Sequence, residues 1–311
     1  MNWIMEGHMK RKQTLYLLAL SFGLGATSNI LADGPTFTQI DFPGSASTQV
    51  WGINANGDMV GGYVNADNST HGFLRTRGDF ISIDFPGAAF TYANAISPRG
   101  DIAGQYAATK DGSGPNHGFV LNRYGLFSTV DFPSAVSNYL SGMNSRGDVV
   151  GVYTKSDNLR HNFVMNADAF SPGGQFKALD DFPGSTQTGA IGMRGDDIVG
   201  VYTLDGVNHG FVLADKTYTT IDVPGASYTN TTGINASGQI VGRYILNGVT
   251  HGYLVSGGQI SSFDFPDALF TGPTTITATG DILGRFQDAN KVFHGFLLTG
   301  FRPVTACPPA N

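Results

Sequence analysis

"HGFLRTRGDFISIDFPG", residues 71–87, decides the fold because its two halves face each other as one β-hairpin. Apolar and polar residues alternate on both sides of Arg77-Gly78, as is typical of strands. Two-residue hairpin loops prefer primed turns with glycine in second place. With Arg77 and Gly78 as the turn, the strand register places His71 directly opposite Asp84.

Both halves of this hairpin recur six times, in units of about 41 to 50 residues. The aspartates of the Asp-Phe-Pro elements, one of which reads Asp-Val-Pro, are Asp41, Asp84, Asp131, Asp181, Asp222 and Asp264. The histidines, each followed by Gly or Asn and an aromatic residue, are His71, His117, His161, His209, His251 and His294. Self-similarity at this period, with several short strands per copy, predicts a β-propeller or a β array.

Each unit contains four strand-like segments, shown by "QVWGIN", "DMVGGYV", "HGFLRT" and "FISIDFP". The link to the next unit begins with Pro-Gly and interrupts the ladder, so the chain can cross there to the next blade. We therefore expect an all-β, six-bladed β-propeller with four antiparallel strands per blade over residues 33–300. The N-terminal "FTQIDFP" is expected to close the last blade beside His294, because the alternative strand in the tail, residues 301–311, has Thr305 in place of the aspartate.

The second strand of each unit alternates an apolar residue with a glycine, which predicts burial on both faces and close approach of an aromatic ring or a neighbouring sheet. The apolar residues are Val60, Ala103, Val150, Val199, Val241 and Leu283, and the glycines are Gly61, Gly104, Gly151, Gly200, Gly242 and Gly284. Small residues are expected to line a crowded central axis, namely Ala93, Ser141, Ala190, Thr232 and Thr275.

The repeated histidines allow three interpretations: a metal ring, a catalytic device or a structural contact. The hairpin register favours structural His-Asp pairs, because each imidazole meets one carboxylate and the outer strands of a propeller keep the pairs apart. The expected pairs are His71 with Asp84, His117 with Asp131, His161 with Asp181, His209 with Asp222, His251 with Asp264, and His294 with Asp41. We accordingly expect neither a metal nor a cofactor.

Residues 1–32 have the pattern of a secretory signal peptide, in which Lys10-Arg11-Lys12 precedes an apolar run and Ala32 marks the cleavage site. We expect a secreted protein, extracellular or periplasmic, that is monomeric and lacks a transmembrane segment after cleavage.

Removing Glu6 and the three basic residues changes the formal net charge from −6 to −8. This negative charge argues against nucleic acid or anionic polysaccharide as a bulk electrostatic partner. Cys307 is the only cysteine, so no internal disulfide forms.

Motifs that carry known chemistry are absent from the sequence. There is no nucleophile elbow, His-Glu-x-x-His pair or phosphate-binding loop. Four Arg-Gly-Asp triplets, which begin at Arg77, Arg99, Arg146 and Arg194, lie where hairpin turns are expected, and Gly-Asp is ordinary turn chemistry. The loops rich in Asp and Asn lack the closing glutamate of a calcium loop.

Residues that differ between the units are better candidates for a binding site, because a site must break the symmetry of the repeat. Aromatic residues vary in the crossing segments and at the start of the inner strands: Trp51, Phe90, Tyr92, Tyr139, Tyr228 and Phe270. They could stack on a sugar ring or hold a peptide. The alternative is that they only wedge between blades.

The repeat resembles the bacterial extracellular repeats of the HAF (His-Ala-Phe) family. "GINASGQIVGRY" leading to "HGYL" and "GINANGDMVGGY" leading to "HGFL" match its layout, with glycine in place of alanine. The fourth and sixth units depart from it, because "IGMRGDDIVG" is one residue short and "TITATGDILG" lacks Gly-Ile-Asn. The resemblance implies export and repetition but no chemistry.

We therefore expect a binding or interaction module for carbohydrate or protein ligands. A polysaccharide lyase or hydrolase and a structural cell-surface or matrix protein are the alternatives.

Overall fold

The chain is all-β in its computed structural model, which describes residues 34–167 and 175–302. These residues contain no α-helix, so the all-β prediction is confirmed. No helix in the described part of the chain is long and apolar enough to cross a membrane. The expected signal peptide and most of the expected tail lie outside the described residues. The residues described all belong to one compact unit, Asp33–Asn311.

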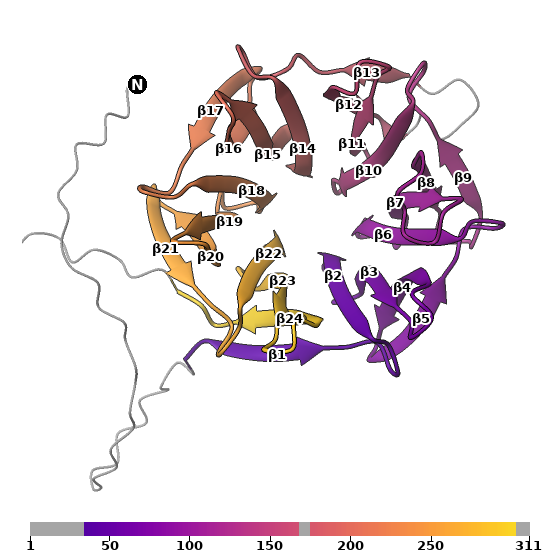
Figure 1. The fold of residues 1–311 in the computed structure, drawn as a ribbon, viewed down its shortest axis with the longest axis horizontal. Helices are drawn as coiled ribbons and strands as arrows, with labels where there is room; N and C mark the ends of the chain where they lie inside the picture. The colour runs from indigo at the N-terminus through magenta and orange to yellow at the C-terminus, as the bar shows by residue number, and fades with distance from the viewer. Residues whose placement is uncertain (1–33, 168–174, 303–311) are drawn as a thin grey trace, which may run out of the picture. The chain divides into compact units, whose positions relative to one another are not determined.

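The strands occupy four successive positions, from the centre of Figure 1 outward. The first position is held by β2 (Ser47–Ile53), β6 (Phe90–Ile96), β10 (Ser137–Met143), β14 (Gln187–Arg194), β18 (Tyr228–Ile234) and β22 (Phe270–Ile276). The second is held by β3 (Met59–Val64), β7 (Ile102–Ala107), β11 (Val149–Thr154), β15 (Asp197–Leu204), β19 (Ile240–Leu246) and β23 (Ile282–Gln287). The third is held by β4 (Thr70–Thr76), β8 (His117–Leu121), β12 (Arg160–Met165), β16 (Val207–Ala214), β20 (Val249–Ser256) and β24 (Phe293–Thr299). The outer position is held by β5 (Asp79–Ile83), β9 (Phe127–Val130), β13 (Phe176–Ala178), β17 (Thr217–Ile221), β21 (Gln259–Phe263) and β1 (Thr36–Ile40).

Antiparallel pairing joins one strand from each position into a four-stranded set. Sets 1 to 5 are β2–β5, β6–β9, β10–β13, β14–β17 and β18–β21, each in chain order. Set 6 combines β22, β23 and β24 with β1 from the other end of the chain. The β1–β24 register runs from Thr36 opposite Thr299 to Ile40 opposite Gly295.

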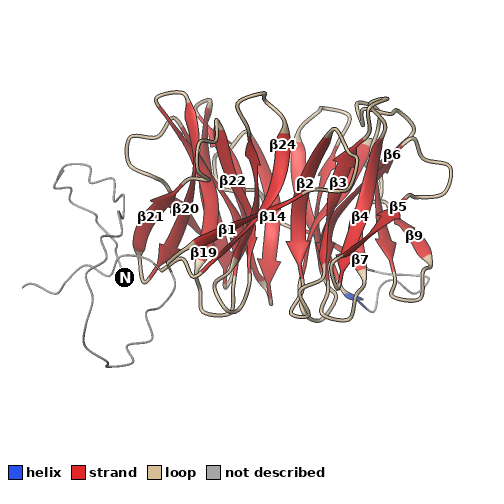
Figure 2. Ribbon diagram, turned by 90° about the horizontal axis from the view of Figure 1, so that it is seen from below, coloured by secondary structure: helices blue, strands red, loops and turns tan. Residues whose placement is uncertain are grey.

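Strands in the first position surround a common axis (Figure 1). Each one contacts the first strand of the next set, and β22 also contacts β2. Seen from the side, the turns gather at two opposite faces (Figure 2). Residues at the beginning of each first strand therefore converge near one face, and residues at its end converge near the other.

The hairpin turns have the backbone conformation that their sequences predict. Arg77 and Gly78 both have positive φ, 51° and 96°, and the turn at Asp215-Lys216 has φ values of 49° and 62°. The β4–β5 pairs, such as Gly72 opposite Ile83, follow the register expected from the turn at Arg77-Gly78.

The glycines of the second strands accept aromatic rings, as predicted. A Cβ atom on Gly61 would lie 2.8 Å from the Phe73 ring, and one on Gly104 would lie 2.8 Å from the Phe119 ring. The aromatic residue of each His-Gly-aromatic unit thus fills the space over a glycine of its own set. The apolar neighbours Val60 and Ala103 are fully buried.

The glycine of the His-Gly-aromatic unit allows the next set to approach. A Cβ atom on Gly72 would lie 3.4 Å from the backbone nitrogen of Ala93, in β6. Asn162 replaces this glycine in set 3 and is buried, with its Oδ1 accepting a 2.7 Å hydrogen bond from Ala190 N of the next set. The one departure from glycine is therefore stabilised by a bond between sets.

The phenylalanine of Asp-Phe-Pro links consecutive sets. Phe42 lies parallel to Tyr63 with 3.7 Å between ring centroids, and Phe182 lies parallel to Tyr202 at 3.6 Å. The backbone nitrogen of Phe42 donates to Thr48 Oγ1 at 2.9 Å. Each Asp-Phe element that has this geometry therefore connects its aspartate to one set and its phenylalanine to the next.

Candidate functional site

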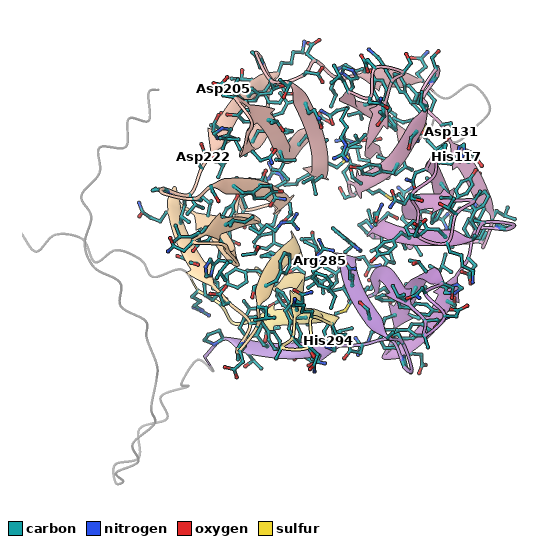
Figure 3. All side chains as sticks on the ribbon, viewed as in Figure 1. His117, Asp131, Asp205, Asp222, Arg285 and His294 are labelled. Carbon is teal, nitrogen blue, oxygen red and sulfur yellow. The ribbon has the colours of Figure 1, made fainter. Side chains whose placement is uncertain are left out.

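The His-Asp residues lie in the third and outer positions, away from the axis; Figure 3 labels His117, Asp131, Asp222 and His294 there. In every set the histidine Nδ1 is within hydrogen-bonding distance of the aspartate. The Nδ1–Oδ distances are 2.6 Å for His71–Asp84, 2.9 Å for His117–Asp131, 2.7 Å for His161–Asp181, 2.9 Å for His209–Asp222, 2.9 Å for His251–Asp264 and 2.9 Å for His294–Asp41.

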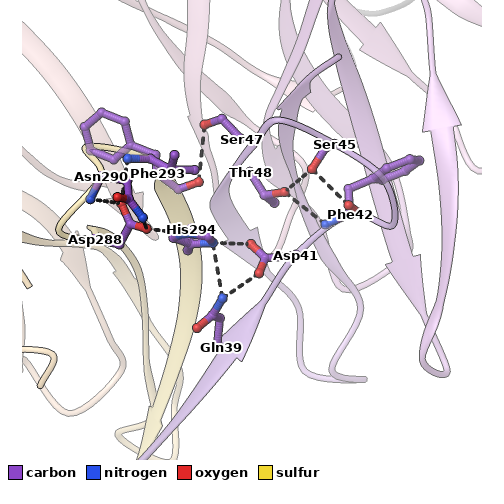
Figure 4. A network of polar contacts seen from close by, with 11 residues as sticks. Gln39, Asp41, Phe42, Ser45, Ser47, Thr48, Asp288, Asn290, Phe293 and His294 are labelled. Carbon is purple, nitrogen blue, oxygen red and sulfur yellow. Dashed lines mark hydrogen bonds and ion pairs between the residues drawn. The ribbon is translucent and has the colours of Figure 1, made fainter. Parts of the chain in front are cut away.

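The pair formed by the two chain ends belongs to a wider polar network (Figure 4). Gln39 Nε2 donates to Asp41 Oδ2 at 2.6 Å, and His294 Nε2 lies 3.7 Å from Asp288 Oδ2. A hydrogen bond from Ser47 Oγ to the Phe293 carbonyl, 3.2 Å long, joins set 1 to set 6. Within this network, His294 Nδ1 contacts both Asp41 and Gln39, and these two contacts join β24 to the N-terminal segment.

No three His, Cys, Asp or Glu side chains within residues 34–167 and 175–302 are grouped so that they could hold a metal ion. The His-Asp pairs are separate along the periphery, and each involves one imidazole and one carboxylate. Their geometry is that of a repeated contact between strands.

A cavity of about 500 Å³ lies on the axis, near the face where the first strands begin. We call it the central cavity. Four of the six aromatic candidates line it: Trp51, Phe90, Tyr92 and Tyr139. Tyr228 and Phe270, the other two, contact an arginine of its wall through their rings, at 5.7 Å and 5.6 Å from the Arg243 guanidinium. The structure thus brings the six residues around one site.

A β-bulge in each first strand aims one side chain at the axis. The register of β2 shifts between Val50 and Gly52, which leaves Trp51 unpaired, and the other five first strands shift at the equivalent place. Bulges are known to redirect side chains beside binding sites. The unpaired residues all line a narrower axial cavity of about 70 Å³ that continues the central cavity: Trp51, Asn94, Ser141, Ile191, Thr232 and Thr274.

The bulge also corrects the expectation about the axis. Ser141, Thr232 and Thr275 do line the narrow cavity. Ala93 and Ala190 do not, because they precede the bulge and their side chains are fully buried in hydrophobic clusters between strands. Strict alternation along the strand fails at the extra residue.

Two arginines line the central cavity, and sequence reasoning missed both. Arg285 lies near the axis (Figure 3) with its guanidinium 4.7 Å from the centroid of Trp51, and it donates to Gln49 Oε1. Phe270 lies within 5.6 Å of both Arg243 and Arg285. Both guanidinium groups therefore lie over aromatic rings, as in cation–π contacts.

The two positive charges have no carboxylate beside them in the cavity wall, whose lining contains neither Asp nor Glu. Neither arginine forms an ion pair within the described residues. Burial, together with the positive charge of Arg243, lowers the pKa of the Arg285 guanidinium to about 10. Arg285 therefore remains protonated at neutral pH, so the cavity is locally cationic in an acidic protein.

The cavity also contains polar atoms that lack a partner in the protein. Trp51 Nε1, Arg285 Nε and Asn116 Oδ1 are buried and unbonded, and these make up half of the six such atoms found in the described residues. Buried polar groups are nearly always hydrogen-bonded. Their concentration at one cavity is typical of a site that water or a polar ligand completes.

The repeat contains a pattern that could have identified the two arginines as binding residues. The second strands carry Val-Gly-x-Tyr or a close variant, and x is Gly62, Gln105, Val152, Val201, Arg243 and Arg285 in successive sets. Gly62 leaves room for Tyr92, whose ring would lie 2.4 Å from a Cβ atom there. This position varies most in size and charge within an otherwise regular segment, as a binding position must.

No known protein-family model matches the chain, and no curated protein matches its sequence. Solved structures do resemble it. AofleA from Arthrobotrys oligospora has a TM-score of 0.57 at 12% identity, over 86% of this chain and 87% of that protein. The β-propeller domain of the trilobed protease from Pyrococcus furiosus has a TM-score of 0.53 at 10% identity, over 84% of this chain and 97% of that domain. A streptogramin B lyase has a TM-score of 0.50 at 14% identity, over 85% of this chain and 97% of the lyase.

These similarities show the fold class: the chain is a β-propeller, as the repeat predicts. At such low identity they do not transfer a ligand or an activity.

Proposed function

We propose that this protein is a secreted carbohydrate-binding module, built as a six-bladed propeller in which each four-stranded set is one blade. On this interpretation β1 closes the last blade, and the cleaved signal peptide directs the protein to the periplasm or the outside of the cell. The resemblance to extracellular HAF repeats supports export. We further propose that the protein acts as a monomer.

The observation that carries the proposed function is the composition of the central cavity. Its aromatic rings offer flat apolar surfaces, on which the C–H face of a sugar ring can stack. Amide side chains provide paired donors and acceptors for neighbouring hydroxyl groups. The amides of the lining are Gln49, Asn94, Gln105, Asn116 and Asn230. Its volume of about 500 Å³ falls within the range of small-molecule sites.

A catalytic role at this cavity has less support. The lining contains no carboxylate, imidazole or thiol. Acid–base chemistry would fall to Tyr92 or Tyr139, and burial raises the pKa of both phenols above 10.0. General acids and bases work best when their pKa lies near the working pH. Binding is therefore the function that this wall supports best.

The test combines a glycan array with a fluorescence titration. The chain has two tryptophans, Trp3 and Trp51, so the full-length Trp3→Phe variant leaves a single indole in the cavity wall. A glycan that binds on the array should change the emission of Trp51 in a saturable way. Tyr139→Ala should then weaken binding by up to about tenfold, because an aromatic contact contributes about 0.5–1.5 kcal/mol beyond its buried area.

Tyr124→Ala provides the matched control, since Tyr124 is 74% exposed and lies outside the cavity. It should leave the affinity unchanged. An array without any ligand, or affinities that do not respond to Tyr139→Ala in a folded variant, would contradict the proposed function.

A further inference from the structure

We propose that the central cavity selects a sugar that carries a carboxylate, such as a uronic acid, through Arg243 and Arg285. This inference deepens the proposed function, on which its carbohydrate part rests. It starts from the two cations in the wall, which have aromatic contacts but no anionic partner in the lining.

The orientation of the guanidinium groups leaves donors for a ligand. Arg243 lies over the ring of Tyr228, and Arg285 lies over the rings of Trp51 and Phe270, so aromatic rings rather than hydrogen-bond acceptors surround much of both groups. A guanidinium has five N–H donors. Arg285 uses one N–H donor in its hydrogen bond to Gln49, and its Nε has no partner. The side chain of Arg243 makes a single long contact, 3.5 Å from Tyr228 Oη. A carboxylate accepts paired donors of this kind.

The electrostatics of the two arginines also favour an anion. Like charges in a partly buried site destabilise each other, and Arg243 contributes to the lowered pKa of Arg285. An anion placed between them would relieve that repulsion and replace the water lost on burial. Arg285 is partly exposed and borders the cavity.

The chemical character of the cavity wall changes around the axis, and this change suggests how a bound sugar would be oriented. Sets 5 and 6 supply Arg243 and Arg285, whereas sets 2 and 3 supply Tyr92 and Tyr139; Trp51 of set 1 lies beside Arg285. A sugar can therefore direct its carboxylate toward one side and its apolar face toward the other.

The net charge of the protein limits the length of the ligand. The whole chain carries a formal charge of −6, and its surface should repel a long polyanion. A short acidic oligosaccharide, or the acidic end of a longer glycan, avoids this repulsion because its charge lies inside the cationic cavity.

Paired ligands test the inference. The full-length Trp3→Phe protein is titrated with trigalacturonic acid, with its fully methyl-esterified form and with sodium acetate. Esterification removes the charge but keeps the sugar ring. We expect the acid to bind about 10- to 100-fold more tightly than the ester, the range for hydrogen bonds to charged groups.

The outcomes separate the two proposals. Equal affinity for acid and ester overturns the carboxylate inference and leaves carbohydrate binding intact. Acetate that changes Trp51 emission while neither oligosaccharide binds supports the anion site and contradicts the carbohydrate function. Absence of binding by all three overturns the carboxylate site itself.

Variants assign the effect to the arginines. Arg243→Gln and Arg285→Gln should each remove most of the preference for acid over ester, measured as the ratio of the two dissociation constants for the same variant. Arg75→Gln is the control, because Arg75 also stacks on an aromatic ring, Phe80 at 5.6 Å, but lies outside the cavity. An acid preference that survives both substitutions overturns the inference.

Thermal melting distinguishes a binding role from a structural one. Removing a buried charge that lacks an anionic partner should not destabilise the fold, so Arg285→Met, which can keep the aromatic contacts, should melt at or above the temperature of the parent protein. A large fall in melting temperature together with unchanged ligand preference would show that Arg285 serves only the packing of the propeller.

Discussion

Phe85 lies parallel to Tyr106, with 3.7 Å between their ring centroids and 3° between their planes, although the two residues belong to different sets. The residue before Phe85 is Asp84, which pairs with His71 of set 1. The Asp84-Phe85 element therefore contacts set 1 through its aspartate and set 2 through its phenylalanine. Set 5 is joined to set 4 by Val223 instead, which cannot form this stack.

The first prediction concerns this stack. Phe85→Val copies the natural residue at position 223, and we expect it to lower the free energy of unfolding by about 1–2 kcal/mol through loss of ring contact. Urea unfolding followed by circular dichroism measures the change. Ile81→Val, on the neighbouring strand at a residue that is 51% exposed, should have almost no effect. Equal effects of the two substitutions would argue against the stack as a link between sets.

A double-mutant cycle tests the His-Asp contact. His251→Ala, Asp264→Ala and the double variant should reveal a coupling energy of about 0.2–1 kcal/mol, the value for cross-strand polar pairs. The pair is partly exposed, with 23% and 46% of the two side chains accessible, so a larger coupling is not expected. Additive effects of the two single substitutions would mean that the pair contributes nothing to stability.

The third prediction uses the turn after Asp-Phe-Pro. Gly44 has a φ of 77° with no atom near its Cβ position, whereas Ser134 holds the equivalent place with a φ of 66°. A side chain in this left-handed conformation costs about 1 kcal/mol. Gly44→Ala should therefore destabilise the protein, and Ser134→Gly should stabilise it, each by about that amount in chemical unfolding. Changes of the same sign in both variants would contradict this explanation.

The repeat predicts the architecture well because the same local chemistry recurs. The turn at Arg77-Gly78 fixes a register, the register brings His71 to Asp84, and Gly61 must accommodate Phe73; each step follows from neighbouring residues in the sequence. The aromatic candidates around the cavity were found because they vary where the rest of the unit is regular.

The cationic side of the cavity was harder to predict. Whether Arg285 faces the axis depends on how β22 and β23 pair, and a bulge interrupts that pairing between Pro273 and Thr275. A bulge changes which face a residue occupies, and apolar alternation does not reveal its position. The equivalent bulge in β6 explains why strict alternation predicts Ala93 on the axis, where the structure has Asn94.

The fourth prediction concerns alkaline pH. Burial and the nearby carboxylates of Asp181 and Asp180 raise the pKa of Tyr218 to about 12, and its hydroxyl donates to the Asp180 carbonyl at 2.6 Å. Since the unfolded phenol has a pKa near 10.0, the folded state binds this proton more tightly, and stability falls as pH rises from about 10 to about 12. This contribution is fully present below pH 10.

Tyr218→Phe removes both the hydrogen bond and the titration. It should be less stable than the parent protein at about pH 9, and the difference should shrink by about pH 11. Urea unfolding at the two pH values measures both proteins. A difference that stays constant with pH would show that Tyr218 does not contribute to the alkaline loss of stability.

The last prediction compares two equivalent isoleucines, one in the set that joins the two ends of the chain and one in a set formed by consecutive strands. Ile40 in β1 and Ile83 in β5 are both buried, each 5% exposed, and each ends an outer strand. β5 is tethered to its set by a tight turn, whereas β1 joins set 6 by pairing with β24 from the other end of the chain. If β1 unfolds together with the rest of the propeller, Ile40→Ala and Ile83→Ala should each lower the free energy of unfolding by about 2–4 kcal/mol. Deleting residues 33–43 should lower the melting temperature more than either substitution, because the strand bonds and the His294–Asp41 contact are lost together. A much smaller effect of Ile40→Ala than of Ile83→Ala, or a melting temperature unchanged by the deletion, would mean that β1 separates from β24 before the rest of the propeller unfolds.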